Sequence, residues 1–115
     1  MHERVRNSNF AVIDPMEFTD LKPDEIERAA SMLKAISHPM RLAILGRLSN
    51  GNRLNVTEIH KLLQIEQSTA SHHLGILKDK GILASVRQGK NTHYYLKREN
   101  LSQLVRCISE CACDD

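Results

Sequence analysis

The chain has 115 residues and a net charge of only +2, with 41% hydrophobic, 26% charged and 3% aromatic residues. This length suits one domain that buries enough apolar surface to fold without disulfides or metals. The low aromatic content argues against a stacking surface for single-stranded nucleic acid. No apolar run approaches the roughly 20 residues that cross a bilayer, and the N-terminus lacks the apolar core of a signal peptide. We therefore expect a cytoplasmic protein with no membrane contact.

The N-terminal third of the chain predicts an irregular arm followed by two helices. Residues 1–21 show no sustained hydrophobic period, whereas from Pro23 onward apolar residues recur at helical spacing, with proline in the first turn. Pro39 cannot continue that helix but suits the first turn of another, which runs to the turn residues Ser49–Asn52. His38, just before this proline, is predicted to cap the second helix or to pack against it.

The middle of the chain predicts a short helix, a tight turn and a longer helix. Asn55, with Glu58 three residues later, has the pattern of a capping box, which would start the short helix. Gln64–Glu66 forms the turn, and the longer helix begins at Gln67 and stops at Gly81. This order of elements is the helix-turn-helix arrangement.

A predicted β-hairpin follows the helix-turn-helix. The stretch "ILASVR" (82–87) favours a strand, "QGKN" (88–91) a turn and "THYYL" (92–96) a returning strand. A last amphipathic helix has an apolar side made of Leu101, Leu104, Val105 and Ile108. The predicted fold is therefore mostly α with a small β-hairpin, a winged helix-turn-helix in one domain, residues 22–113.

Small polar side chains occupy the N-terminal half of the longer helix, over a stretch from Gln67 to about His73. Its inward side would carry Ala70, Leu74 and Leu77, since these follow helical spacing. Its outward side would carry Gln67, Ser68, Ser71 and His72. A recognition helix enters the major groove N-terminal end first, and short donors and acceptors there reach base edges and phosphates. The alternative is a solvated helix of poor intrinsic propensity.

Basic charge is concentrated in the same part of the chain. Residues 53–98 hold eight Lys and Arg against three Asp and Glu, and both ends of the chain are acidic. Arg87 and Lys90 lie at or beside the predicted hairpin tip, where a wing can reach phosphates or the adjacent minor groove. The alternatives are chance clustering of surface lysines and a flexible exposed turn. Together with the order of elements, these features indicate binding to double-stranded DNA.

Three stretches resemble the ArsR/SmtB family of small metal-sensing repressors, namely "AASMLKAISHPMRLAILGRLSNG", "QSTASHHLGILKDKGIL" and "RQGKNTHYYL". The resemblance covers about Arg28 to Leu104. It implies a homodimer whose terminal helices pair and which holds two recognition helices over a palindromic operator. The apolar side of the last helix agrees, because it needs a partner. The family's pattern places four residues at groove-facing positions: Ser68, Thr69, Ser71 and His72.

The resemblance also has departures that concern sequence preference and metal sites. Many relatives have Arg where this chain has His72, and Glu66 stands where a Ser often caps the helix, so the operator sequence does not follow from the family. The "CVC"-like site of arsenic and cadmium sensors is replaced by "NVT" at Asn55–Thr57. The terminal-helix zinc site is also absent as known, since Arg98, Glu99, Asn100 and Glu110 occupy that region.

All three cysteines fall in "CISECAC", at Cys107, Cys111 and Cys113. The first two are four residues apart and so share one face of the last helix. Thiolates at this spacing could converge on Zn(II), Cd(II), Cu(I) or As(III), and such binding across a dimer interface could bias the arrangement that fits DNA. The alternatives are redox sensing through a disulfide or persulfide bridge between Cys111 and Cys113, and cysteines that only fill the helix surface.

The sequence does not point to an enzyme. It holds no Gly-rich phosphate loop and no Ser/His/Asp set with supporting context. We predict a dimeric, sequence-specific DNA-binding repressor that is released from its operator by a thiol-reactive effector. A winged-helix module that binds protein, without an effector site, is the alternative from another class.

Overall fold

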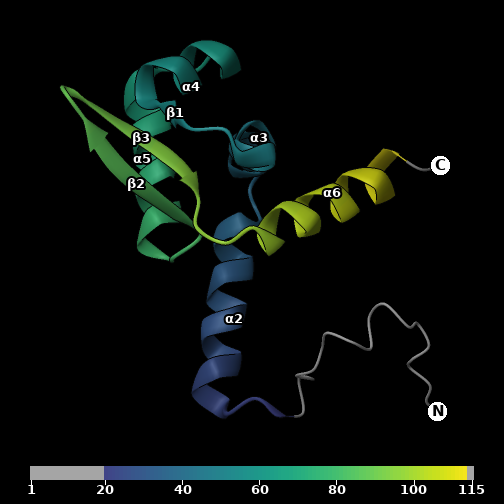
Figure 1. Ribbon diagram of the computed structural model, residues 1–115. Coiled ribbons are helices and arrows are strands. Elements are labelled where there is room, and N and C mark those ends of the chain that lie inside the picture. The colour runs from purple at the N-terminus through teal and green to yellow at the C-terminus, as the bar shows by residue number, and fades with distance from the viewer. Residues whose placement is uncertain (1–19, 114–115) are drawn as a thin grey trace. The chain divides into compact units, whose positions relative to one another are not determined.

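The computed structural model describes residues 20–113 (Figure 1). The chain divides into two units at Ala30 and Ser31. The boundary falls inside the first described helix, α2 (Pro23–Ile36), and everything after α2 belongs to the second unit. The predicted irregular arm, residues 1–21, lies almost wholly outside the described residues.

Helix α3 (Pro39–Leu48) begins as its sequence predicts. The side chain of His38 caps it, with Nδ1 accepting a hydrogen bond from the backbone N–H of Met40 at 3.0 Å. The proline at the first helical position costs nothing there, because that position has no intrahelical hydrogen bond to lose. The predicted capping role of His38 is confirmed. A short 3₁₀ turn, η2 (Ser49–Gly51), follows.

The helix-turn-helix consists of α4 (Val56–Leu63) and α5 (Gln67–Asp79). A reciprocal capping box starts α4, in which Asn55 Oδ1 accepts the N–H of Glu58 at 2.8 Å and Glu58 Oε1 accepts the N–H of Asn55 at 2.9 Å. Gln64, in the left-handed region at φ 56°, ends this helix. Gly81 has φ +78° just after α5, which a glycine adopts without the penalty of a Cβ. The predicted helix-turn-helix and its boundaries are confirmed.

The wing is a three-stranded antiparallel sheet rather than a hairpin alone. Strands β2 (Leu83–Gln88) and β3 (Asn91–Leu96) form the predicted hairpin, and β1 (Leu54–Asn55) pairs with the other side of β3. The predicted four-residue turn shortens to two residues, because Gln88 pairs with Asn91 and Gly89 supplies the positive φ of 64° that a tight turn needs.

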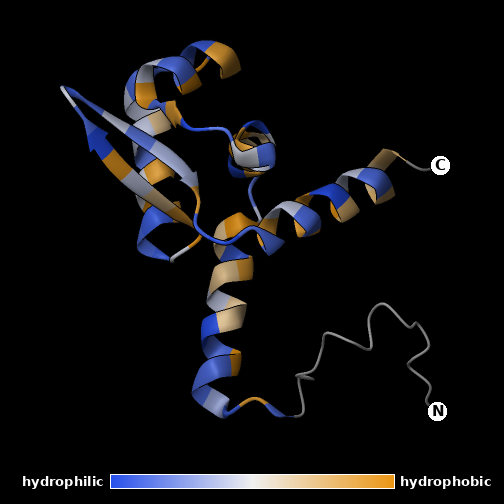
Figure 2. Ribbon diagram, in the orientation of Figure 1, coloured by the Kyte–Doolittle hydropathy of each residue, from blue (hydrophilic) through white to orange (hydrophobic). Residues whose placement is uncertain are grey.

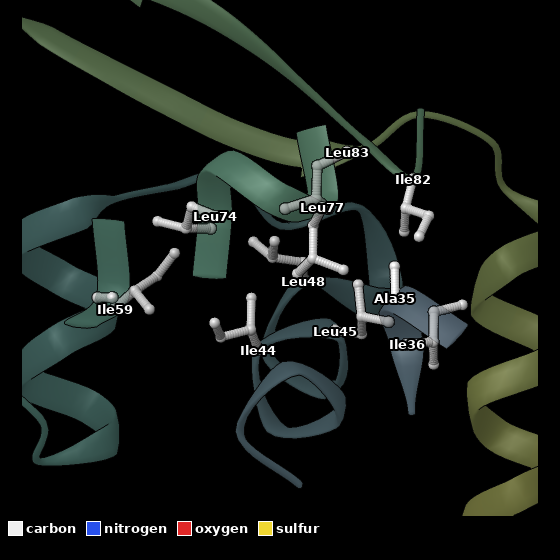
Figure 3. Close-up of a cluster of buried hydrophobic side chains, with 11 residues drawn as sticks. Ala35, Ile36, Ile44, Leu45, Leu48, Ile59, Leu74, Leu77, Ile82 and Leu83 are labelled. Atoms are coloured by element: carbon white, nitrogen blue, oxygen red, sulfur yellow. The ribbon is translucent and has the colours of Figure 1, made fainter. Parts of the chain in front are cut away.

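The hydrophobic core lies where α3, α4, α5 and the start of β2 meet the end of α2 (Figure 3). Its members are Ala35, Ile36, Ile44, Leu45, Leu48, Ile59, Ala70, Leu74, Leu77, Ile82 and Leu83. Each large side chain buried there contributes roughly 1.5–3 kcal/mol. The last helix, α6 (Asn100–Cys113), lies against α3 and η2 but contains no fully buried residue. None of the described helices is long and apolar enough to cross a membrane.

Candidate nucleic-acid interface

Helix α5 has one face buried in the core and one face exposed. Ala70, Leu74 and Leu77 have no exposed surface. The five residues of α5 that are predicted to contact DNA lie exposed in the N-terminal half of the helix: Gln67, Ser68, Thr69, Ser71 and His72. The core therefore holds α5 by its apolar side and leaves a row of short hydrogen-bonding groups free for a partner.

Gly75 continues this exposed face towards the C-terminus. A Cβ built at Gly75 would meet no atom within 4 Å, so packing in the chain itself does not demand a glycine there. Glycine inside a helix costs about 0.5–1 kcal/mol relative to alanine. An unforced glycine in mid-helix allows another molecule to approach the backbone closely.

The first turn of α5 offers unpaired backbone donors. Its N-cap residue, Glu66, makes no side-chain capping hydrogen bond, and the first turn carries no acidic residue. The first N–H groups of a helix lack partners within the helix, and its dipole places positive potential there. Together they form a favourable place for a phosphate.

Arg87 and Lys90 lie at the tip of the wing, which projects beyond the helices in Figure 1. Both are exposed, and Arg87 Nε donates a hydrogen bond to the carbonyl oxygen of Gly89 at 3.3 Å, which orients this guanidinium at the turn. The structure thus groups the predicted contacts into two places, the N-terminal half of α5 and the wing tip.

His73 does not belong to the exposed stretch, contrary to the prediction from its polar neighbours. Only 7% of its surface is exposed, because it stands three residues after Ala70 and four before Leu77, on the inward side. Its Nδ1 accepts a hydrogen bond from Arg41 Nε at 3.1 Å, and its ring lies 4.6 Å from that of His38. Its helical spacing from Ala70 and Leu77 is the feature of the sequence that could have predicted a buried position for His73.

The three cysteines are exposed, free thiols on α6. Cys107 and Cys111 lie one turn apart on the same face of α6. Cys113 is the last residue of this helix. At 3.6 residues per turn, its side chain points about 160° away from that of Cys111. The described residues hold no group of three His, Cys, Asp or Glu that could bind a metal. Within one chain the structure therefore does not bring the three thiols together, and their role as ligands stays a prediction.

Comparisons with known proteins agree with this geometry. A family model described as "Helix-turn-helix domain" matches residues 36–86. The transcriptional regulator YgaV of Escherichia coli is 32% identical over 87 residues, 76% of this chain and 88% of that protein. The transcriptional repressor PagR of Bacillus anthracis is 34% identical over 73% of this chain and 84% of its own. A homologue of the cadmium resistance regulatory protein CadC from Staphylococcus aureus is 33% identical, covering 80% and 86%.

Solved structures share the fold. The crystal structure of PagR superposes with a TM-score of 0.69 at 33% identity, covering 76% of this chain and 99% of that one. A homodimeric winged helix-turn-helix DNA-binding domain from Mycobacterium bovis gives a TM-score of 0.71 at 27% identity, covering 77% of this chain and 82% of that one. The predicted winged helix-turn-helix class is confirmed.

Proposed function

The chain belongs to the ArsR/SmtB family of winged helix-turn-helix transcriptional regulators, and from this premise we propose that it is a dimeric repressor that contacts a palindromic operator with α5 and the wing. It is a DNA-binding regulator, not an enzyme. The observation that carries the operator-contact proposal is the division of α5 into a wholly buried apolar side and an exposed side of short polar groups.

Each place on the surface has a distinct part in binding. On α5, the amide of Gln67 and the hydroxyls of Ser68, Thr69 and Ser71 are short groups that hydrogen-bond to base edges and phosphates in the major groove. His72 adds an imidazole that donates to either. At the wing, Arg87 and Lys90 contact the sugar-phosphate backbone and supply affinity that does not depend on sequence.

Helix α6 supports the dimeric part of the proposal. Leu101, Leu104 and Val105 are half-buried against the core, and Ile108 further along is 41% exposed. Figure 2 shows apolar and polar residues alternating along α6, which leaves an apolar stripe only partly covered by its own chain. The homodimeric state of the Mycobacterium bovis domain agrees with pairing of this kind. A two-fold dimer would place two copies of α5 on successive major grooves, which requires a palindromic site.

The test is binding to the DNA upstream of the protein's own gene, measured by fluorescence anisotropy. We expect Ser71→Glu/His72→Glu to lower affinity by at least about 100-fold, because two carboxylates would face bases and phosphates. Arg106→Glu on α6 changes the net charge by the same amount away from α5 and serves as the matched control. Unchanged binding by the α5 variant, with the dimer intact, would refute the assignment.

The salt dependence of binding tests the wing. We expect Lys90→Ala to weaken binding to all duplex sequences alike and to reduce the slope of log affinity against log salt by about 0.9, the value of one phosphate contact. A winged-helix module that binds protein instead would bind duplex DNA weakly or not at all at low salt.

For the effector, we propose a thiophilic metal or metalloid ion held by Cys107 and Cys111, with further ligands from the second chain. Side chains one turn apart on a helix have Cβ atoms about 5–6 Å apart, whereas a disulfide needs about 3.5–4.5 Å. A direct disulfide would therefore distort α6, while two thiolates can share one ion without distortion. The similarity to a homologue of a cadmium resistance regulatory protein, CadC, supports this chemistry.

A further inference from the structure

Arg41 connects three helices through two hydrogen bonds. It projects from α3, donates from Nε to His73 Nδ1 on α5 at 3.1 Å, and donates from Nη1 to the backbone carbonyl of Ala35 near the end of α2 at 3.0 Å. Ala35 is nearly buried and its carbonyl belongs to the last turn of α2. Because a guanidinium is planar and rigid, its two donors fix the directions of both acceptors at once.

The hydrogen bond to His73 fixes the protonation state of that imidazole. Arg41 has only donors, so Nδ1 of His73 must be unprotonated, and the ring must be the neutral form with its proton on Nε2. A second proton on Nδ1 would set two N–H groups against each other and place two cations in contact. The ring of His38 lies beside that of His73, with the ring centroids 4.6 Å apart.

We propose that Arg41 is a positioning residue that fixes the recognition helix α5 against the end of α2, and that this Arg41–His73 clamp holds only while His73 is neutral. The inference rests on the proposed function in one respect, namely that α5 is the helix that contacts DNA. It adds a regulatory consequence, because any change at the end of α2, or acidification, would alter the position of α5 through the same side chain.

The surroundings of His73 oppose its protonation. Burial lowers the pKa of His73, and the neighbouring His38, Arg41 and His72 lower it further. His38 and Arg41 approach from the side of α3, and His72 is its neighbour on α5. The charged groups that lower this pKa lie on α3, at its N-cap and on α5 itself, and α4 and β2 also pack against α5. Because this pKa is lowered, the clamp is closed at neutral pH and opens at a more acidic pH than an unperturbed histidine would require.

Two substitutions of Arg41 test the positioning role. We expect Arg41→Ala and Arg41→Lys each to lower operator affinity about tenfold, the size expected when a partly buried hydrogen bond is lost, and to speed amide hydrogen exchange along α5. A lysine keeps the charge but cannot reproduce the two-pronged geometry. If Arg41 merely contacted phosphate, lysine would restore binding, alanine would reduce the salt slope, and exchange in α5 would not change. That result would overturn the proposal.

The proton dependence is tested on the free protein, so that it does not rely on DNA binding. Nitrogen NMR of the imidazole of His73 should show an unprotonated Nδ1 at neutral pH, and exchange along α5 should accelerate as that nitrogen is protonated. His73→Asn places Oδ1 where Nδ1 was, which keeps an acceptor for Arg41 but removes the titration, and α5 should then be insensitive to pH. A protonated Nδ1 at neutral pH, or exchange that ignores protonation, would refute the clamp. If the unaltered protein does not bind its operator although both NMR and exchange results hold, only the proposed function is refuted.

Discussion

Helices α5 and α6 are almost equal in length, 13 and 14 residues, but they use their apolar sides differently. Four residues of α5 are buried, and its other side carries short polar groups. No residue of α6 is buried, although three of its apolar residues touch the core. The apolar side of α5 is therefore covered within one chain and its opposite side stays exposed, whereas α6 retains apolar surface that a second chain can cover.

The largest effect on stability should come from the inner side of α5. We expect Leu74→Ala to lower the free energy of unfolding by about 2–5 kcal/mol, since the removed atoms leave a cavity in a close-packed core. Leu62→Ala on α4 makes the same chemical change at a side chain that is 46% exposed, and it should cost less than about 1 kcal/mol. Urea denaturation of both variants measures the difference. Similar losses would show that the core is not centred on α5.

A charge on the apolar side of α6 should affect assembly rather than folding. We expect Ile108→Glu to raise the dissociation constant of the dimer by at least about 30-fold, or roughly 2 kcal/mol, because a carboxylate would be buried in the interface. Sedimentation equilibrium measures the dimer, and circular dichroism should show an unchanged helix content. Arg106→Glu, two residues away and exposed, is the control. If Ile108→Glu unfolds the monomer instead, the apolar side of α6 packs against the core of its own chain and does not form the dimer interface.

Sequence reasoning was most successful where a local signal decides the backbone. The capping box at Asn55 and Glu58, the proline at position 39 and the glycine at 81 each act within a few residues, and the structure confirms all three boundaries. The exposed and buried sides of α5 followed from helical spacing for the same reason. These features need no knowledge of what the helix packs against.

The features that sequence reasoning missed depend on contacts between distant residues. Strand β1 is only two residues long and exists because Leu54 and Asn55 lie beside Tyr94 and His93 of β3. His73 was grouped with its polar neighbours because its partner, Arg41, is 32 residues away in the sequence. A residue that bonds inward through a polar atom carries no hydrophobic signal, so only its position on the helix could have revealed it.

Substitution of the cysteines tests whether α6 binds an effector in addition to forming the dimer interface. In the unaltered protein, Cd(II), Zn(II), Cu(I) or As(III) should lower operator affinity by about 5–150-fold, the range of a typical coupling between two sites. We expect Cys107→Ser/Cys111→Ser to bind the operator as tightly as the unaltered protein does, but to keep that affinity when these ions are added. Cys113→Ser, on the other face of α6, is the matched control and should keep its response. An unchanged response in the double variant would leave these thiols as surface groups.

The smallest expected effect concerns the outer side of α5. Gly75→Ala should raise the free energy of unfolding by about 0.5–1 kcal/mol, because it removes the entropic cost of glycine and the new methyl group meets no atom of the chain. Gly75→Leu should also stabilise the free protein, yet it should lower operator affinity several-fold, since a bulky side chain would hold the helix out of the groove. For Gly75→Leu, the free energy of unfolding from urea denaturation should therefore rise while the operator affinity from fluorescence anisotropy falls. If both variants bind as tightly as the original chain, the DNA does not approach this part of α5, and the contact surface is confined to the first two turns of the helix and the wing.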